Sequence, residues 1–206
     1  MGPLIHSICI VVLAAGKSAR LGRPKQLLSF EGGSLVQHAV SVALSSGLGP
    51  VLVVTGANRE AVESELRGQG VHTSFNPDWE EGMGASIRHG VDAALELDPD
   101  ADGLIFMVCD QPYITASLLQ HLLETQHETG RKIVASEYGG IRGTPALYHA
   151  SLFEELKTLS GDKGAKPVLA RHESDIATVP FGSGATDIDT EADYENLLMA
   201  LNKQKT

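Results

Sequence analysis

Short apolar runs alternate with segments of helical periodicity along the first 135 residues of the chain. The first run, Ile8 to Leu13, is continuously apolar, which is typical of a strand buried on both faces. Similar runs occur at 51–54, 71–75, 104–108 and 133–135. Such alternation predicts a mostly parallel sheet with helices on both faces. We therefore expect an α/β fold, built as a three-layer α/β/α sandwich.

The starts of the helices and the order of the later elements can also be predicted. Ser34, Asn58 and Thr115 precede helical patterns, and their side chains are of the types that cap helix N-termini. After residue 135 the pattern is irregular, and we expect a short strand at 146–148, helices near 151–159 and 165–172, an edge strand at 176–179 and a last helix at about 191–201. The chain has no repeat or linker, so its 206 residues predict a single domain, 1–206.

The composition excludes several classes of partner. The formal net charge is −10, from 16 Lys and Arg residues against 26 Asp and Glu residues. A field of this sign repels nucleic acids and anionic membranes, so neither is expected as a partner. No apolar run reaches the roughly 18 residues of a membrane helix, and the run from Ile8 to Ala15 enters a glycine loop rather than a cleavage site. We expect a cytoplasmic protein, with Cys9 and Cys109 as buried, reduced thiols.

The loop after the first expected strand, Ala14 to Lys25, combines small residues with positive charge. Small residues let the backbone approach a ligand, and successive N–H groups can bind an anion. Lys17, Arg20, Arg23 and Lys25 are four of the chain's 16 Lys and Arg residues. The spacing matches neither a Walker A loop nor the dinucleotide fingerprint. A bound polyphosphate would explain this local reversal of charge; the alternative is a flexible surface loop with solvated charges.

Aspartates stand at two places where they can meet a ligand. Asp110 follows the apolar run 104–108, and ligands of parallel sheets gather at the carboxyl ends of strands. A carboxylate there can hold Mg²⁺, which takes oxygen ligands, although Asp110 can also serve as a turn residue. Asp187 and Asp189 lie two positions apart, so on an extended segment both would point the same way. The alternative is that Asp189 or Thr190 caps the last helix.

Six segments together resemble one known family. Leu13-Ala14-Ala15-Gly16-x-Ser18-x-Arg20-x-Gly22-x-Pro24-Lys25 resembles the signature of the nucleotidyltransferases related to MobA and MocA, the molybdenum cofactor guanylyl- and cytidylyltransferases. The others, which resemble the MocA-like branch in order, are Asn76-Pro77-x-Trp79-x-x-Gly82-Met83-x-x-Ser86, Cys109-Asp110-Gln111-Pro112, Arg142-Gly143-x-Pro145, Gly161-Asp162-x-Gly164-Ala165 and Asp187-Ile188-Asp189-Thr190. The resemblance spans nearly the whole chain. It implies a Rossmann-like sheet of the nucleotide-diphospho-sugar transferase type.

The resemblance also implies a reaction. A phosphate oxygen of molybdopterin or of the molybdenum cofactor would attack the α-phosphorus of a nucleoside triphosphate and expel pyrophosphate. A phosphate monoester is largely ionised at neutral pH, so no general base is required. The protein would then bring anions together, align them and stabilise charge, with Mg²⁺ as the cofactor. Residues 1–115 would form the nucleotide-binding half, and residues 116–206 the half that binds the pterin-type acceptor.

Roles for individual residues follow from the same resemblance. Arg20 and Lys25 would contact the triphosphate, and together with Asp110 they are the expected catalytic residues. Asp110 and Asp189 would hold the metal, with Asp187 as the alternative to Asp189. The expected nucleotide-binding residues are Leu13, Ala14, Ala15, Gly16, Lys25, Gly82 and Ser86. Arg142 and Lys166 could meet the phosphate of the acceptor, although both could also be charged tips of surface turns. Asn76 and Trp79 are expected to shape the loop around Gly82.

The nucleotide and the acceptor are less closely specified. Guanylyl relatives tend to carry a second glycine where this chain has Ala15, so the resemblance favours CTP. The alternatives are a guanylyltransferase that uses GTP, a transferase for another phosphorylated small molecule, and a non-catalytic module that delivers a cofactor. The presence of Arg20, Lys25, Asp110 and Asp189 favours catalysis over the last of these. Transient contact with a molybdoenzyme is a further expectation.

Overall fold

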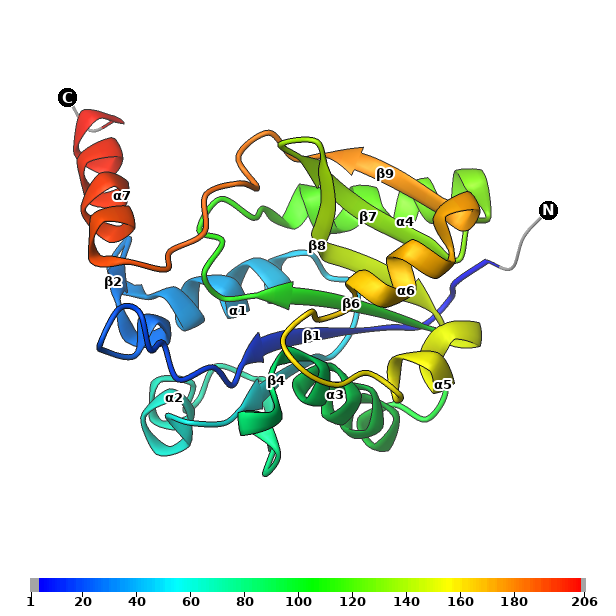
Figure 1. Cartoon of the computed structure of the whole chain (residues 1–206), viewed down its shortest axis with the longest axis horizontal. Helices are drawn as coiled ribbons and strands as arrows, with labels where there is room; N and C mark the ends of the chain where they lie inside the picture. The colour runs from blue at the N-terminus through cyan, green and yellow to red at the C-terminus, as the bar shows by residue number, and fades with distance from the viewer. Residues whose placement is uncertain (1–3, 205–206) are drawn as a thin grey trace.

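The computed structural model describes residues 4–204, so residues 1–3 and 205–206 of the expected domain lie outside the described part. Among the described residues, seven strands form one sheet in the order β5-β4-β1-β6-β8-β7-β9 (Figure 1). They are β1 (Ile8–Ala14), β4 (Val51–Thr55), β5 (His72–Phe75), β6 (Gly103–Val108), β7 (Ile133–Tyr138), β8 (Ile141–His149) and β9 (Ile176–Pro180). Only β8 runs antiparallel to its neighbours, which confirms the predicted mostly parallel sheet.

Helices cover both faces of the sheet, as the three-layer prediction requires. One face carries α1 (Leu35–Ser45), α2 (Arg59–Glu65) and α4 (Ala116–Thr129); the other carries α3 (Met83–Leu97), α5 (Phe153–Leu156) and α6 (Lys166–Arg171). Successive strand residues point to opposite faces, so β1 divides its side chains between two cores. Ile10 and Val12 join the core beneath α1, whereas Val11 and Leu13 join the core beneath α3. Its unbroken apolar sequence follows from this double burial.

The end of the chain packs apart from the sheet. The last helix, α7 (Glu191–Gln204), projects at one end of the molecule (Figure 1). It packs against a small hairpin of β2 (Ser29–Phe30) and β3 (Gly33–Ser34) through a separate apolar cluster that includes Phe30, Ile188 and Leu197. The Tyr194 hydroxyl donates to the Ser29 carbonyl at 2.9 Å. This packing brings residues 187–189 beside the loop that follows β1.

The predicted helix caps are confirmed in two cases and wrong in one. The Ser34 hydroxyl accepts from the Gln37 backbone, and the Gln37 side chain accepts from the Ser34 N–H, which completes a capping box at α1. The Thr115 hydroxyl accepts from Leu118 N at 3.2 Å at the start of α4. Asn58 occupies the corresponding position before α2, but its side chain makes no capping hydrogen bond.

The later part of the sheet differs in detail from the prediction. The expected strand at 146–148 is the end of a longer strand, β8, which begins at Ile141. Residues 146–149 of β8 pair with β6 on one side, and β8 pairs with β7 along most of its length on the other. These partners are distant in sequence or reached through a turn, so the local pattern revealed only the apolar end of the strand. The predicted edge strand is β9.

Two further predictions concern the state of the cysteines and the absence of membrane-spanning segments. Cys9 and Cys109 are free and buried, as predicted, and burial raises the pKa of each thiol to about 12. Within residues 4–204, no helix combines the length and the apolar character needed to cross a membrane.

Candidate active site

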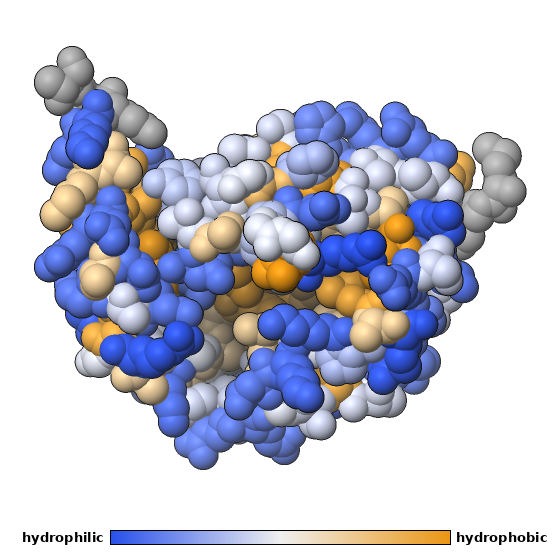
Figure 2. All heavy atoms as spheres, turned by 45° about the horizontal axis from the view of Figure 1, so that its top comes forward, coloured by the Kyte–Doolittle hydropathy of each residue, from blue (hydrophilic) through white to orange (hydrophobic). Residues whose placement is uncertain are grey.

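A cleft of about 640 Å³ lies at the carboxyl ends of β1 and β6. Its walls come from the loop 13–26, the segment 79–86, the end of β6 at 108–110, and Asp162. Figure 2 shows one face of the molecule hollowed near its middle, with apolar residues on the floor and hydrophilic residues around the rim. Ligands of open α/β sheets bind at this edge, so the cleft is the candidate active site.

Buried side chains hold the loop after β1 in place. Gln26 lies in the short helix η1 (Lys25–Leu27), is 1% exposed and donates to the carbonyls of Ala14 and Gly16 at 3.0 and 2.7 Å. The Ser18 hydroxyl accepts from Lys25 N at 3.0 Å. These bonds fix the backbone of the loop, in contrast to the alternative of a flexible surface loop with solvated charges. Sequence reasoning missed Gln26, although its position directly after Lys25 placed it beside the expected site.

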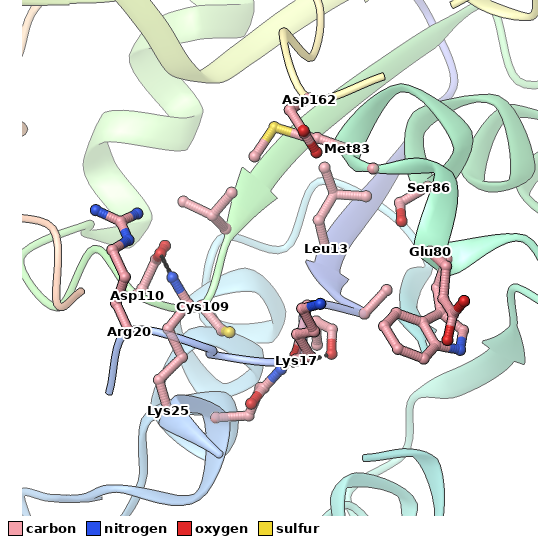
Figure 3. A pocket seen from close by; sticks show the side chains of 17 residues that line it. Leu13, Lys17, Arg20, Lys25, Glu80, Met83, Ser86, Cys109, Asp110 and Asp162 are labelled. Atoms are coloured by element: carbon pink, nitrogen blue, oxygen red, sulfur yellow. Dashed lines mark hydrogen bonds and ion pairs between the residues drawn. The ribbon is translucent and has the colours of Figure 1, made fainter. Parts of the chain in front are cut away.

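Arg20, Lys25 and Asp110, three of the expected catalytic and metal-binding residues, line this cleft, and Asp189 contacts two of them. The Lys25 ammonium contacts the Asp110 carboxylate and lies 3.1 Å from Asp189 Oδ1. The other oxygen of Asp189 accepts from Arg20 Nη2 at 2.8 Å. Figure 3 shows Arg20, Lys25 and Asp110 at one end of the pocket. Asp189 is 164 residues from Lys25 in sequence, and the packing of α7 brings it here.

Charge balance explains how these groups coexist. Burial opposes the ionised form of Lys25, but the adjacent Asp110 and Asp189 carboxylates outweigh burial and raise the Lys25 pKa. The lysine therefore stays cationic at neutral pH. Asp187 is separated from Asp189: it lies against Gln111 and lines a smaller pocket of about 270 Å³ with Tyr113. Burial, together with repulsion from Asp110 and Asp189, raises the Asp187 pKa.

The cap of the last helix, α7, is Thr190 rather than Asp189. The Thr190 hydroxyl accepts from Asp193 N at 3.2 Å, and Asp193 Oδ2 accepts from Thr190 N at 2.8 Å. Thr190 and Asp193 thus form the reciprocal bonds of an N-terminal cap for α7. The Asp189 carboxylate is left to face Lys25 and Arg20.

A buried glutamine ties the segment before Asp189 to the end of β6. Gln111 is 4% exposed, and its Nε2 donates to the Gly184 carbonyl at 3.0 Å and to the Tyr138 hydroxyl at 3.2 Å. Its Oε1 accepts from Thr144 at 3.2 Å. Ile188 N also donates to the Asp110 carbonyl at 3.0 Å. These bonds set Asp189 opposite Asp110, a positioning role that sequence reasoning did not assign.

The two carboxylates fit a divalent cation that also binds phosphate. Asp110 and Asp189 both contact the single ammonium of Lys25, so their oxygens already converge on one positive group. Among the described residues, no group of three or more His, Cys, Asp or Glu side chains is arranged to hold a metal. Two carboxylates completed by phosphate oxygens and water suit Mg²⁺, which is seldom held by an all-protein cage.

The opposite wall is formed by the start of α3. Gly82 has a φ of 103°, a conformation that favours glycine. Ser86 lines the cleft, and its hydroxyl accepts from Asn76 Nδ2 at 3.2 Å. Asn76 is 1% exposed and its Oδ1 accepts from Asp78 N at 3.0 Å, so it braces this wall. Trp79, also expected to shape the loop, lines the cleft itself.

The other charged residues of interest do not all lie in the cleft. Lys17 lines the cleft, whereas Arg23 pairs with Glu191 at 2.5 Å. Arg142 and Lys166, the expected acceptor-binding residues, line a separate groove of about 660 Å³. Glu80 and Asp162 line the cleft but had no assigned role, because nothing in their local sequence pattern places them beside β1.

The chain is similar to several known proteins. The model of the MobA-like NTP transferase domain matches residues 10–176. The chain is 33% identical to nicotine blue oxidoreductase of Paenarthrobacter nicotinovorans over 91% of its length and 95% of that protein. It is 30% identical to purine catabolism protein PucB of Bacillus subtilis over 93% and 96%, respectively. It is 29% identical to a probable molybdenum cofactor guanylyltransferase of Bacillus cereus over 72% of each.

Solved structures show the same relationship. The crystal structure of Rv0371c from Mycobacterium tuberculosis superposes with a TM-score of 0.82 at 30% identity, covering 94% of this chain and 99% of that one. A structure of Rv0371c in complex with manganese superposes with a TM-score of 0.78 at 27% identity over the same shares. The matched domain and these full-length likenesses lead to one conclusion: the chain belongs to the MobA-like NTP transferase family and is a nucleotidyltransferase of that type.

Proposed function

We propose that the protein transfers CMP from CTP to the phosphate of molybdopterin or of the molybdenum cofactor and releases pyrophosphate. The observation that carries this proposal is the meeting of Arg20, Lys25 and Asp110 at one end of the cleft, with Asp189 in contact with both cations. Two cations among carboxylates, in a molecule of net charge −10, suit a reaction between two anions assembled with a metal.

The chemistry places few demands on the protein beyond alignment and charge. An oxygen of the acceptor phosphate forms a bond to the α-phosphorus, and the bond from that phosphorus to the bridging oxygen breaks as pyrophosphate leaves. Arg20 and Lys25 bind the triphosphate and offset charge at the α-phosphorus. The backbone of Leu13 to Gly16, held by Gln26, orients the nucleotide. The acceptor phosphate is already ionised, so no base has to be supplied.

Asp110 and Asp189 are the residues that would hold Mg²⁺. A bound divalent ion would supply positive charge that offsets the charge of the phosphates, and the manganese complex of Rv0371c supports a metal in a relative of this chain. Lys25 contacts both carboxylates, so it must yield some of these contacts when the ion is held there. We assign Lys25 to the triphosphate in that state.

CTP is the proposed nucleotide because of residue 15. Ala15 is 5% exposed and lines the cleft, so its methyl group takes space that a glycine would leave open. A pyrimidine needs less room than a purine. A probable molybdenum cofactor guanylyltransferase among the relatives supports a molybdopterin-type acceptor but makes GTP the main alternative.

The acceptor is assigned to the half of the chain after residue 116. Asp162 lines the nucleotide cleft, whereas Lys166 and Arg142 line the neighbouring groove. The segment 162–166 therefore reaches both hollows. Arg142 Nη1 lies 4.0 Å from Glu173 Oε1, a weak pairing that a phosphate could replace.

The test is pyrophosphate release by the purified protein with Mg²⁺ and either CTP or GTP, with and without molybdopterin or its molybdenum-loaded form. We expect release that needs the acceptor and is faster with CTP. Faster release with GTP would correct the nucleotide, and binding without any turnover would favour a delivery module. The name of the relative from Paenarthrobacter makes oxidation or reduction of nicotine blue a second activity to assay with the same protein.

Asp110→Asn provides the matched variant for the metal. It keeps the size of the side chain, so the thermal unfolding curve should remain cooperative while Mg²⁺-dependent turnover falls by about 10²-fold or more. Asp100→Asn makes the same chemical change at an exposed turn and should leave turnover intact. Full activity in Asp110→Asn would remove Asp110 from the reaction.

A further inference from the structure

The charged groups of the cleft are unevenly placed. One end holds Arg20 and Lys25 together with Asp110. Away from this group, Asp162 lies beside Met83 and Glu80 lies below Ser86, and Lys17 is the labelled cation near the middle of the view (Figure 3). Within the described residues, neither Asp162 nor Glu80 forms a hydrogen bond or an ion pair with another side chain. A ligand group beside either carboxylate therefore meets free acceptors.

Packing against the start of α3 fixes the position of Asp162. Gly84 N donates to the Gly161 carbonyl at 2.8 Å, which joins the segment 160–164 to the cleft wall. A Cβ on Gly82 would collide with the Asp162 carboxylate and would lie 2.8 Å from the Gly161 carbonyl oxygen. A Cβ on Gly164 would lie 2.8 Å from Met83 Sδ. Glycine at positions 82 and 164 thus lets the segment 160–164 pack closely against the start of α3, and this packing places Asp162 at the cleft wall.

Charge decides which part of the substrates can lie beside Asp162. Both reactants carry phosphate groups, and a phosphate next to the unpaired carboxylate of Asp162 would be repelled. The triphosphate is attracted to the end that holds Arg20 and Lys25. The nucleobase is neutral, and the cleft also offers apolar side chains, Leu13 and Val108, against which a flat ring can pack. The base is therefore the part of the nucleotide that reaches Asp162.

We infer that Asp162 is a specificity-determining residue that selects a nucleobase bearing an exocyclic amino group. This inference rests on the proposed nucleotidyl transfer. An ionised carboxylate only accepts hydrogen bonds, so it can pair with the amino group at C4 of cytosine. In uracil the same position carries a carbonyl oxygen, which also only accepts, and the two acceptors repel each other. Asp162 therefore admits CTP and excludes UTP, whereas Ala15 acts on the size of the base.

The experiment compares the binding of CTP and UTP, which share the triphosphate and sugar and differ at C4 and N3 of the base. Dissociation constants are measured by calorimetry with Mg²⁺ and without an acceptor. We expect wild type to bind CTP about 10- to 100-fold more tightly, the range for a hydrogen bond to a charged group. In Asp162→Asn the amide can accept from cytosine or, after rotation, donate to uracil. The preference for CTP should therefore fall about tenfold or more.

Controls separate failure of this inference from failure of the proposed function. Asp162→Ala removes the carboxylate without adding a donor, so it should lose CTP affinity, and its UTP affinity should rise only by the repulsion that is relieved. Asp100→Asn should retain the wild-type preference, and thermal unfolding of each variant reports its folding. An unchanged CTP-to-UTP ratio in Asp162→Asn, or equal binding of CTP and UTP by wild type, overturns the role of Asp162. If wild type binds neither CTP, GTP nor UTP, the proposed transfer fails and this inference fails with it.

Discussion

At the scale of single residues, Lys25 is the group on which the arrangement of the site depends. It is 19% exposed and lies between two carboxylates, Asp110 and Asp189, whose mutual repulsion it offsets. Removing one member of such a group leaves a partly buried charge without compensation, which is costly. The site is therefore held together, without a ligand, by the same charges that we assign to the reaction.

Arg20 offers the sharpest test of a catalytic role. Its side chain is 72% exposed, and within residues 4–204 it forms an ion pair with Asp189 alone, so little of the fold depends on it. Arg20→Ala should lower kcat by roughly 10²-fold because charge at the α-phosphorus is less well stabilised. The dissociation constant for CTP should change far less. Arg20→Lys keeps the charge but loses the planar guanidinium, so its kcat should lie between that of wild type and that of Arg20→Ala. A loss of CTP affinity alone would contradict this role.

At the scale of elements, α1 and its capping box support the loop that carries the cations. Ser34 is 4% exposed and begins the helix directly after the β2–β3 hairpin. Gln37 also donates to the Glu65 carbonyl at 2.9 Å and so joins α1 to the end of α2. The geometry of the hairpin, on which α7 packs, is thus set by the start of α1.

Ser34→Ala should reduce the free energy of unfolding by about 1 kcal/mol, because the first turn of α1 loses a hydrogen-bond acceptor. Ser34→Gly should cost less, only a few tenths of a kcal/mol. Urea denaturation of the two variants beside wild type measures both effects. Equal losses in the two variants would mean that Ser34 acts through packing rather than through the cap.

A second element-scale contact, between α5 and α6, should depend on pH. Burial opposes ionisation of Glu155, but hydrogen bonds from His172 Nε2 at 2.6 Å and Arg171 Nε at 2.5 Å outweigh it and lower the Glu155 pKa from 4.5. A lowered pKa in the folded state means that this stabilisation is complete above pH 4.5 and is lost as the pH falls through the folded value.

Glu155→Gln should therefore be less stable than wild type at neutral pH, by about 1 kcal/mol. This difference in the free energy of unfolding should shrink as the pH is lowered below the ordinary range of a glutamate, because Glu155 of wild type is then protonated and, like glutamine, uncharged. Denaturation series at successive pH values measure it. A difference that grows on acidification would show that the sign of the linkage is wrong.

At the scale of the whole molecule, the cleft joins segments that are far apart in sequence. The sheet order places β1 beside β6, and α7 returns to the hairpin. This topology brings together loop 13–26, wall 79–86, Asp110, Asp162 and Asp189. Binding of a ligand at their meeting point should therefore stabilise the molecule as a unit.

Mg²⁺ with CTP at about 100 times its dissociation constant should add about 2.7 kcal/mol of stability, which corresponds to a rise in Tm of about 5–10 °C. Amide hydrogen exchange across 187–194 should slow in the same sample, because Asp189 belongs to the site. Calorimetry and exchange mass spectrometry measure the two effects. A rise in Tm without added protection at 187–194 would separate the end of the chain from the nucleotide site.

The sequence by itself determined the class of fold, the order of most elements and the first loop of the site. These depend on local signals: alternating burial along strands, helical periodicity, capping residues, and the cation-rich loop beside Gly16. Asp110 was also predictable, because a polar residue directly after a buried strand lies at the edge where ligands bind.

Only the tertiary structure decided which distant residues meet. Asp189 reaches Lys25 because α7 packs on the hairpin, and Gln26 and Gln111 fix the site through backbone carbonyls that no local pattern identifies. It also placed Asp162 in the cleft and Arg142 in a separate groove. The physical reason is that periodicity and propensity record the burial of nearby residues. Contacts across more than a hundred positions depend on chain topology and packing, which those signals do not contain.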